Sequence, residues 1–349
     1  MASSRHAAAR RRRALVGWCA VLTTSCVVLG SLGSLESATV FVDGSAAADA
    51  AGGGLELDGE VVVVGAGVEL VWQRPAGVAK GVLALLHGCS HRGTDAWPAG
   101  ARCGECAGLP VETRIVGAAL ARGWAVVAVT SEDRGSGCWS GGDAPRVAAA
   151  IDHVRAASDA GPLTAALGAS SGGAMATAVP GVGAAVAQVM ASHARLDATH
   201  PPVRFVHMAR DDRTAQRVAR QLDRLREARV DAGEYVVHPE PVTADALFQR
   251  GPGPGGRVLP TRALAAAAAK ALEDGGFLDG EKRLTEDPRR SQWRAALRPV
   301  VPRDVDSFVA DESPVSEVLN AAWAAHEFTD AFLDETLDWL DSAAARLRT

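Results

Sequence analysis

The stretch with the clearest chemical potential is Gly168-Ala-Ser170-Ser-Gly172, which has the Gly-x-Ser-x-Gly spacing of a nucleophile elbow. It follows the apolar segment Leu163–Leu167 and leads into small residues that suit a helix. A turn this tight admits only small residues two positions either side of the serine, and it leaves the serine hydroxyl clear of the backbone. The pattern can arise by chance among 37 glycines, so its surroundings must support it. We expect Ser170 to be a nucleophile; Ser171, with one glycine at the same spacing, is the alternative.

A serine nucleophile needs an acid that orients its base, and in this kind of fold the acid follows the serine in the chain. Asp211 follows the apolar strand predicted at Val203–Met208 and is followed directly by Asp212. An aspartate before a helix often caps its first turn. We therefore expect Asp211 to be the acid and Asp212 to cap the helix that begins at Arg213.

Two histidines compete for the role of the base. His238 follows the apolar strand 234–237 directly, whereas His326 precedes the closing amphipathic helix 330–348. A histidine that introduces a last helix suits this order of residues better, so His326 is favoured and His238 is the alternative.

The loop His87-Gly88-Cys89-Ser90 follows the continuously apolar segment Gly81–Leu86. Backbone N–H groups in such a loop, together with the N–H after the nucleophile, can stabilise an oxyanion. We predict that the N–H groups of Cys89 and Ser171 do this. Three tryptophans, Trp97, Trp139 and Trp293, are candidates for the wall of an acyl pocket.

Apolar strand-like segments alternate with helical ones, which indicates an α/β fold with a mostly parallel central sheet flanked by helices. The first two strands, 55–64 and 68–72, are predicted to form a hairpin around Gly65-Ala-Gly67. Residues 240–310 contain a Gly-Pro-Gly-Pro-Gly-Gly breaker and no strand pattern, so we expect a mainly helical insertion there that could serve as a lid. The predicted domain spans residues 55–349 and follows an Ala/Gly-rich linker, 37–54.

Residues 1–36 resemble a targeting segment. Five arginines lie in residues 1–13, and residues 14–30 carry no charge. This pattern predicts entry into the secretory pathway, as a cleaved signal or a retained single-pass membrane anchor. A plastid or other organellar transit peptide is the alternative. The formal net charge of −5 argues against a nucleic-acid partner.

Four cysteines lie beyond this segment: Cys89, Cys103, Cys106 and Cys138. An even number suits an oxidising compartment, so two disulfides are expected, with the pairing open. A zinc site from Cys103, Cys106, Cys89 and His91 is the less favoured alternative, because a second spaced pair is lacking. No metal or cofactor is expected.

The chain resembles the α/β-hydrolase superfamily, and more narrowly it is similar to a little-characterised plant and algal group with an N-terminal hydrophobic segment. The matching runs are His87-Gly-Cys-Ser-His91, Cys103-x-x-Cys106-x-Gly-Leu-Pro110, Cys138-Trp139, Gly168 to Gly173, Phe205 to Asp211 and Ala325-His-Glu327. The resemblance implies an α/β-hydrolase fold and a Ser170–Asp211–His326 triad.

We therefore expect a serine hydrolase that cleaves an ester, thioester or amide of a small-molecule acyl substrate through a covalent acyl-enzyme. The alternatives are a non-catalytic scaffold used for binding and an acyltransferase. Substrate and oligomeric state are not readable from the sequence.

Overall fold

The computed structural model describes residues 55–346 except 66, 193–195, 252 and 302–312. The predicted targeting segment and linker lie outside these residues. In the described part of the chain, no helix combines the length and the apolar character needed to cross a membrane.

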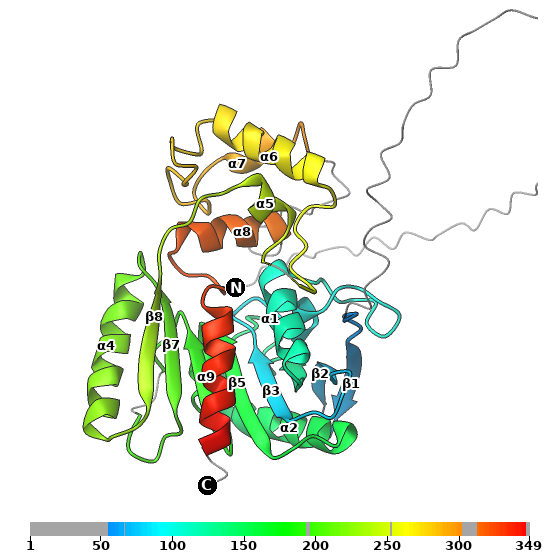
Figure 1. The fold of residues 1–349 in the computed structure, drawn as a ribbon, viewed down its shortest axis with the longest axis vertical. Helices are drawn as coiled ribbons and strands as arrows, with labels where there is room; N and C mark the ends of the chain where they lie inside the picture. The colour runs from blue at the N-terminus through cyan, green and yellow to red at the C-terminus, as the bar shows by residue number, and fades with distance from the viewer. Residues whose placement is uncertain (1–54, 66, 193–195, 252, 302–312, 347–349) are drawn as a thin grey trace, which may run out of the picture. The chain divides into compact units, whose positions relative to one another are not determined.

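An eight-stranded sheet forms the centre of the fold, in the order β1-β2-β4-β3-β5-β6-β7-β8 (Figure 1). β1 pairs antiparallel with β2, β2 pairs antiparallel with β4, and all later pairs are parallel. The strands are β1 (Glu60–Val64), β2 (Val68–Gln73), β3 (Gly81–Leu86), β4 (Trp124–Val129), β5 (Leu163–Ala169), β6 (Ala184–Gln188), β7 (Val203–Met208) and β8 (Ala232–Val237). This order and the alternation of strands with helices make it an α/β-hydrolase fold, as predicted.

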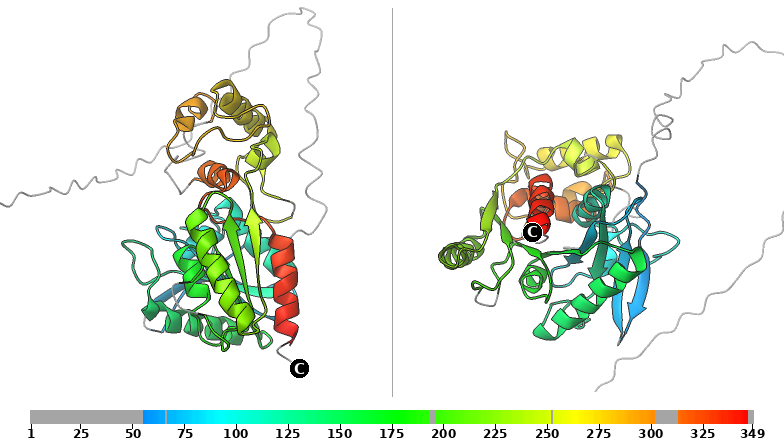
Figure 2. Two further views of the ribbon diagram at one scale, coloured as in Figure 1. Left: turned by 90° about the vertical axis from the view of Figure 1, so that its left-hand side faces the viewer. Right: turned by 60° about the horizontal axis from the view of Figure 1, so that its bottom comes forward.

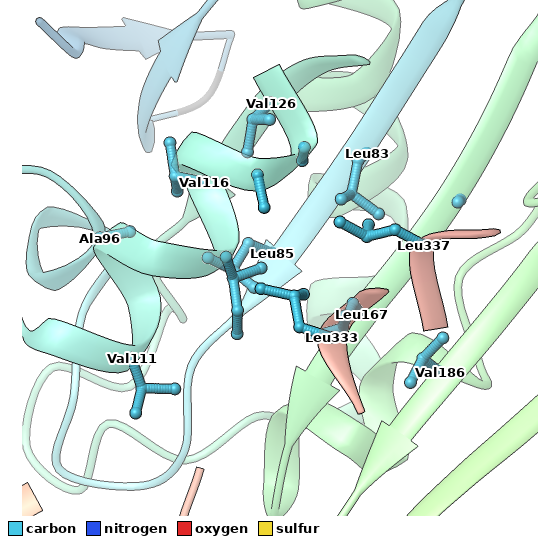
Figure 3. Packing of buried hydrophobic residues seen from close by; sticks show 14 of the residues in the cluster. Leu83, Leu85, Ala96, Val111, Val116, Val126, Leu167, Val186, Leu333 and Leu337 are labelled. Carbon is cyan, nitrogen blue, oxygen red and sulfur yellow. The ribbon is translucent and has the colours of Figure 1, made fainter. Parts of the chain in front are cut away.

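Helices cover both faces of the sheet, because its inner strands are apolar on both sides. α1 (Pro110–Ala121) and α9 (Leu333–Arg346) pack on one face (Figures 1 and 2). Figure 3 shows Leu333 and Leu337 of α9 against Leu83, Leu85 and Leu167 of β3 and β5. The other face carries α2 (Ala144–Ser158), α3 (Ser171–Ala176) and α4 (Asp212–Glu227).

Between β8 and α9 the described residues form four further helices with a small core of their own. They are α5 (Ala244–Phe248), α6 (Arg262–Asp274), α7 (Trp293–Leu297) and α8 (Pro314–Trp323). Leu247, Leu272, Trp293 and Leu319 are fully buried in this cluster. Figure 1 shows the four helices together beyond one end of the sheet.

The boundaries of several elements differ from the sequence prediction. β1 begins at Glu60, so residues 55–59 are not part of it, and β2 extends to Gln73, one residue beyond the predicted end. α9 begins at Leu333 rather than at residue 330. The helix α8, which directly precedes the loop of His326, was not predicted.

Candidate active site

The turn after β5 places Ser170 in a strained backbone conformation, with φ +53° and ψ −118°. This is an unusual region for a residue with a side chain, and such strain is typical of functional turns. The Ser170 N–H donates to the carbonyl of Gln188 at 2.9 Å, which ties the turn to the end of β6. The hydroxyl is thereby held at the carboxyl ends of the parallel strands.

Both glycines of the elbow are required by close backbone contacts. A Cβ at Gly172 would lie 2.3 Å from the carbonyl oxygens of Leu86 and His87, and one at Gly168 would lie 2.3 Å from the carbonyl of Gly172. Backbone atoms this close cannot yield as a flexible side chain could. The elbow therefore packs directly against the start of the 87–90 loop.

We expect Gly172→Ala to lower the free energy of unfolding by about 1–3 kcal/mol, because the added methyl overpacks this contact. Chemical denaturation measures the change. Gly280→Ala is the matched control, since a Cβ there would meet no atom within 4 Å. Equal stability of the two variants would contradict the packing described.

The structure brings the three predicted triad residues together. His326 Nε2 lies 3.1 Å from Ser170 Oγ, and His326 Nδ1 lies 2.8 Å from Asp211 Oδ2. In this arrangement Nδ1–H donates to the carboxylate and Nε2 is free to accept the serine proton. The alternative base, His238, is exposed after the end of β8. The catalytic roles themselves stay predictions.

The prediction that Asp212 caps the helix was wrong. Asp211 is itself the N-cap of α4, because its Oδ1 accepts the Thr214 N–H at 3.0 Å while Oδ2 accepts from His326. Asp212 is the first residue of the helix. Burial acts to raise the pKa of the Asp211 carboxyl, but the hydrogen bonds from His326 and Thr214 outweigh it and hold that pKa below its ordinary value.

The 87–90 loop is shaped by the buried side chain of His87. Burial lowers the pKa of His87 to about 4, although the hydrogen bond with the Gly88 carbonyl acts the other way. The neutral ring donates from Nδ1 to the Gly88 carbonyl at 2.6 Å and accepts the Ser131 N–H at Nε2, 3.2 Å away. Because the peptide bond is trans, the Cys89 N–H points away from this carbonyl.

Neither the Cys89 N–H nor the Ser171 N–H donates to another protein group in the described part of the chain. Cys89 and Ser170 line the same cavity. The two N–H groups thus suit the predicted oxyanion role.

A second loop, residues 136–139, packs against the 87–90 loop and holds it in place. Cys89 forms a disulfide with Cys138, and Trp139 Nε1 donates to the His87 carbonyl at 2.8 Å. The Ser90 N–H donates to the Ser136 carbonyl at 2.8 Å. Three contacts from residues 136–139 therefore hold the backbone that carries the Cys89 N–H.

All four described cysteines are paired, because the second disulfide joins Cys103 and Cys106. The alternative zinc site is therefore wrong. The predicted tryptophan wall is wrong as well. Trp97 and Trp293 are fully buried in separate cores, and Trp139 packs against His87 with the two rings tilted by 38° and their centroids 4.9 Å apart. None of the three lines the cavity at Ser170.

Removing the long-range disulfide with Cys89→Ala/Cys138→Ala should cost about 2–4 kcal/mol of unfolding free energy. The chain between the two cysteines is 49 residues long, so the cross-link removes much entropy from the unfolded chain. The control is Cys103→Ala/Cys106→Ala, whose separation of 3 residues predicts less than about 2 kcal/mol from the same chain-entropy relation. Urea unfolding compares the variants, and a larger loss in the control would contradict the expectation.

The loop that carries His326 is fixed by four side chains, of which only Glu327 belongs to a sequence run named above. Gln188 Nε2 donates to the Thr329 carbonyl at 2.9 Å, and the Thr329 N–H returns a bond to Gln188 Oε1 at 3.0 Å. Arg289 Nη2 donates to the His326 carbonyl at 2.7 Å and to Glu327 Oε2 at 2.8 Å. Asn320 Nδ2, from α8, also donates to Glu327 Oε2 at 3.0 Å. Asn320 is the only asparagine of the chain, which was the one available sequence signal.

A cavity of about 370 Å³ opens at the triad. Ser170 and His326 line it, with Gly88 and Cys89 of the loop beside them. Five ionisable side chains also line it: His91, Glu112, Asp287, Arg289 and Glu327. A larger cavity of about 730 Å³, between α5 and the start of α9, contains none of the triad residues in its lining.

No protein-family model matches the chain, and no curated protein is similar to it in sequence. Solved structures of esterases are similar in fold. One is Thermogutta terrifontis esterase 2 phosphoramylated by tabun, with 14% identity, 64% of this chain and 97% of that chain covered, and a TM-score of 0.41. The acetyl xylan esterase from Aspergillus awamori is 14% identical, with 49% of this chain and 80% of that chain covered and a TM-score of 0.37. Carboxyl esterase 2 from the mycorrhizal fungus Tuber melanosporum is 14% identical, with 53% of this chain and 78% of that chain covered and a TM-score of 0.38.

Proposed function

We propose that this protein is a serine hydrolase that cleaves an ester, or a thioester or amide, through a covalent acyl-enzyme. The observation that carries the proposal is the unbroken series of contacts from Ser170 Oγ through His326 to Asp211 Oδ2. A strained serine, a histidine at its hydroxyl and a half-buried acid at the second ring nitrogen are the parts that acyl transfer requires.

In the first half of the reaction, Ser170 Oγ attacks the acyl carbon while His326 Nε2 takes the hydroxyl proton. The Cys89 and Ser171 N–H groups stabilise the negative oxygen, and Asp211 stabilises the imidazolium. The bond from the acyl carbon to the leaving alcohol then breaks, and His326 returns its proton to that alcohol. Water repeats the sequence on the acyl-enzyme, which releases the acid and restores Ser170.

A fluorophosphonate probe tests the proposal directly. We expect the folded wild type to be labelled and Ser170→Ala to be unlabelled. Ser171→Ala is the matched variant: it should keep its label, since Ser171 supplies only its backbone N–H. If Ser171→Ala loses the label while Ser170→Ala keeps it, Ser171 is the nucleophile. A folded wild type that takes no label would favour the non-catalytic binding scaffold.

Transfer of the acyl group to an alcohol instead of water is the remaining alternative. Product analysis in the presence of added alcohols separates it from hydrolysis. We further propose an oxidising, secretory compartment for the protein, supported by the disulfides Cys89–Cys138 and Cys103–Cys106. Membership in the plant and algal group stays a proposal that depends on the sequence runs given above.

A further inference from the structure

Behind the cavity at Ser170 lies a buried pair of carboxyl groups that the proposed mechanism does not use. Glu112 of α1 and Glu317 of α8 are each 3% exposed, and their side chains are hydrogen-bonded to each other. Two carboxylates in direct contact cannot both stay ionised, so they share a proton. Glu317 Oε2 accepts the Val111 N–H at 3.0 Å, and Glu112 is the member of the pair that lines the cavity.

The electrostatics place the charge of the pair on Glu112. Burial, and then the charge of Glu112, raise the pKa of Glu317 well above its ordinary range. Burial also raises the pKa of Glu112, although its bond with Glu317 and the nearby charge of His91 oppose this. Burial favours neutral His91, yet its hydrogen bond with Asp95 and the charge of Glu112 raise its pKa to about 9. His91 is therefore a cation near Glu112.

Glu112 retains capacity to accept a hydrogen bond. No N–H or hydroxyl group of the described residues donates to its Oε2, and no lysine or arginine among them forms an ion pair with it. The proton shared with Glu317 fills one of the acceptor sites of the Glu112 carboxylate, which has about four. A buried carboxylate whose other acceptor sites are unfilled costs free energy. A substrate group that supplies the missing donor would recover that cost, and one that lacks it would be rejected.

The charges around Glu112 indicate which kind of substrate group could donate a hydrogen bond to it. His91 and Arg289 carry positive charge in the same wall, and Asp287 and Glu327 carry negative charge. A fully charged alcohol group of either sign would meet a like charge there, and a wholly apolar one would leave these side chains desolvated. The acyl chain can contact Ala169, Val189, Ala325 and Phe328, which line the same cavity. Neutral hydroxyl groups both donate and accept. The volume of about 370 Å³ is near the lower limit for ligand pockets, which suits one sugar-sized group with a short acyl chain.

We propose that the substrate is an ester of a neutral polyhydroxylated alcohol, such as an acylated sugar, and that Glu112 accepts a hydrogen bond from one of its hydroxyls. This inference rests on the proposed serine hydrolase function and adds the substrate class to it. Glu317 is a positioning residue, because it acts on the substrate only through Glu112.

The test compares two acetate esters that differ in the alcohol: methyl 6-O-acetylglucoside and cyclohexylmethyl acetate. We expect wild-type kcat/KM to favour the sugar ester at least tenfold. Glu112→Gln, which keeps shape but loses charge, should lower that preference at least tenfold. Glu227→Gln, at an exposed position of α4, is the matched control and should keep the preference. A wild type without the preference, or a Glu112→Gln variant that retains it, would overturn the inference.

If Glu112→Gln does not fold, the proposed substrate class is tested on the wild type, by how well an added alcohol protects it from fluorophosphonate labelling. Millimolar methyl glucoside should slow fluorophosphonate labelling more than cyclohexylmethanol does at the same concentration. Equal protection, or better protection by cyclohexylmethanol, refutes the sugar-like substrate. If the folded wild type is not labelled and hydrolyses neither ester, the proposed hydrolase function itself is refuted. If the wild type is labelled but does not prefer the sugar ester, only the proposed substrate class is refuted.

Discussion

Ser170→Ala is expected to lower kcat on a good ester substrate by about 10⁴- to 10⁶-fold, and His326→Gln should cause a comparable loss. In the proposed mechanism the two groups act as one unit, since His326 Nε2 lies 3.1 Å from Ser170 Oγ, within reach of its proton. Removing either one leaves only binding and oxyanion stabilisation. The double variant should therefore lose little more than either single variant.

Steady-state kinetics on purified protein measures these losses. His238→Gln is the control for the base, because His238 is exposed after β8 and was the alternative in the sequence. The His326 side chain is 47% exposed, so its replacement should leave thermal unfolding nearly unchanged. A His238→Gln variant that loses activity while His326→Gln keeps it would reverse the assignment of the base.

Asp211→Asn should lower kcat by about 10⁴-fold while the helix cap is kept. An asparagine can still accept the Thr214 N–H as an N-cap, but its amide cannot stabilise the imidazolium or hold the required tautomer of His326. Asp211→Ala removes both functions and should cost about 1 kcal/mol of stability in addition. Asp212→Asn, at the first position of α4, is the matched control and should change kcat little.

The same carboxyl makes stability depend on pH in a defined direction. The pKa of Asp211 is lower in the folded protein than its ordinary value of about 4, so the unfolded chain binds the proton more readily. Its contribution to stability is present above that ordinary value and is lost as pH falls through the folded value. Denaturation at several pH values should show the stability difference between wild type and Asp211→Asn shrinking below about pH 4. A difference that grows with acid would contradict the lowered pKa.

Much of the candidate site could be predicted because its parts depend on local sequence. The elbow requires glycines within two residues of Ser170, and the acid and the 87–90 loop each follow an apolar strand. In a parallel sheet, the carboxyl ends of neighbouring strands meet at one edge, so the spacing alone brings Ser170, Asp211 and Cys89 together. The position of β7, Val203–Met208, agreed with the prediction at both ends.

The predictions that proved wrong concern residues whose role depends on distant contacts. Asp211 and Asp212 both precede a helix, and only the tertiary structure shows that Asp211 caps it while also contacting His326. Trp97, Trp139 and Trp293 were candidates for the wall of an acyl pocket, yet each packs elsewhere.

By itself the sequence determined the fold class, the strained serine turn and the order of nucleophile, acid and base, because these follow from short-range spacing and strand periodicity. Only the tertiary structure decided the pairing of Cys89 with Cys138 and the choice of His326 over His238 beside Ser170. It also decided the pairing of two carboxyl groups, since Glu112 and Glu317 are 205 residues apart in the sequence and meet only when α8 packs against α1. Burial then gives these carboxyls a shared proton, a property that no local pattern encodes.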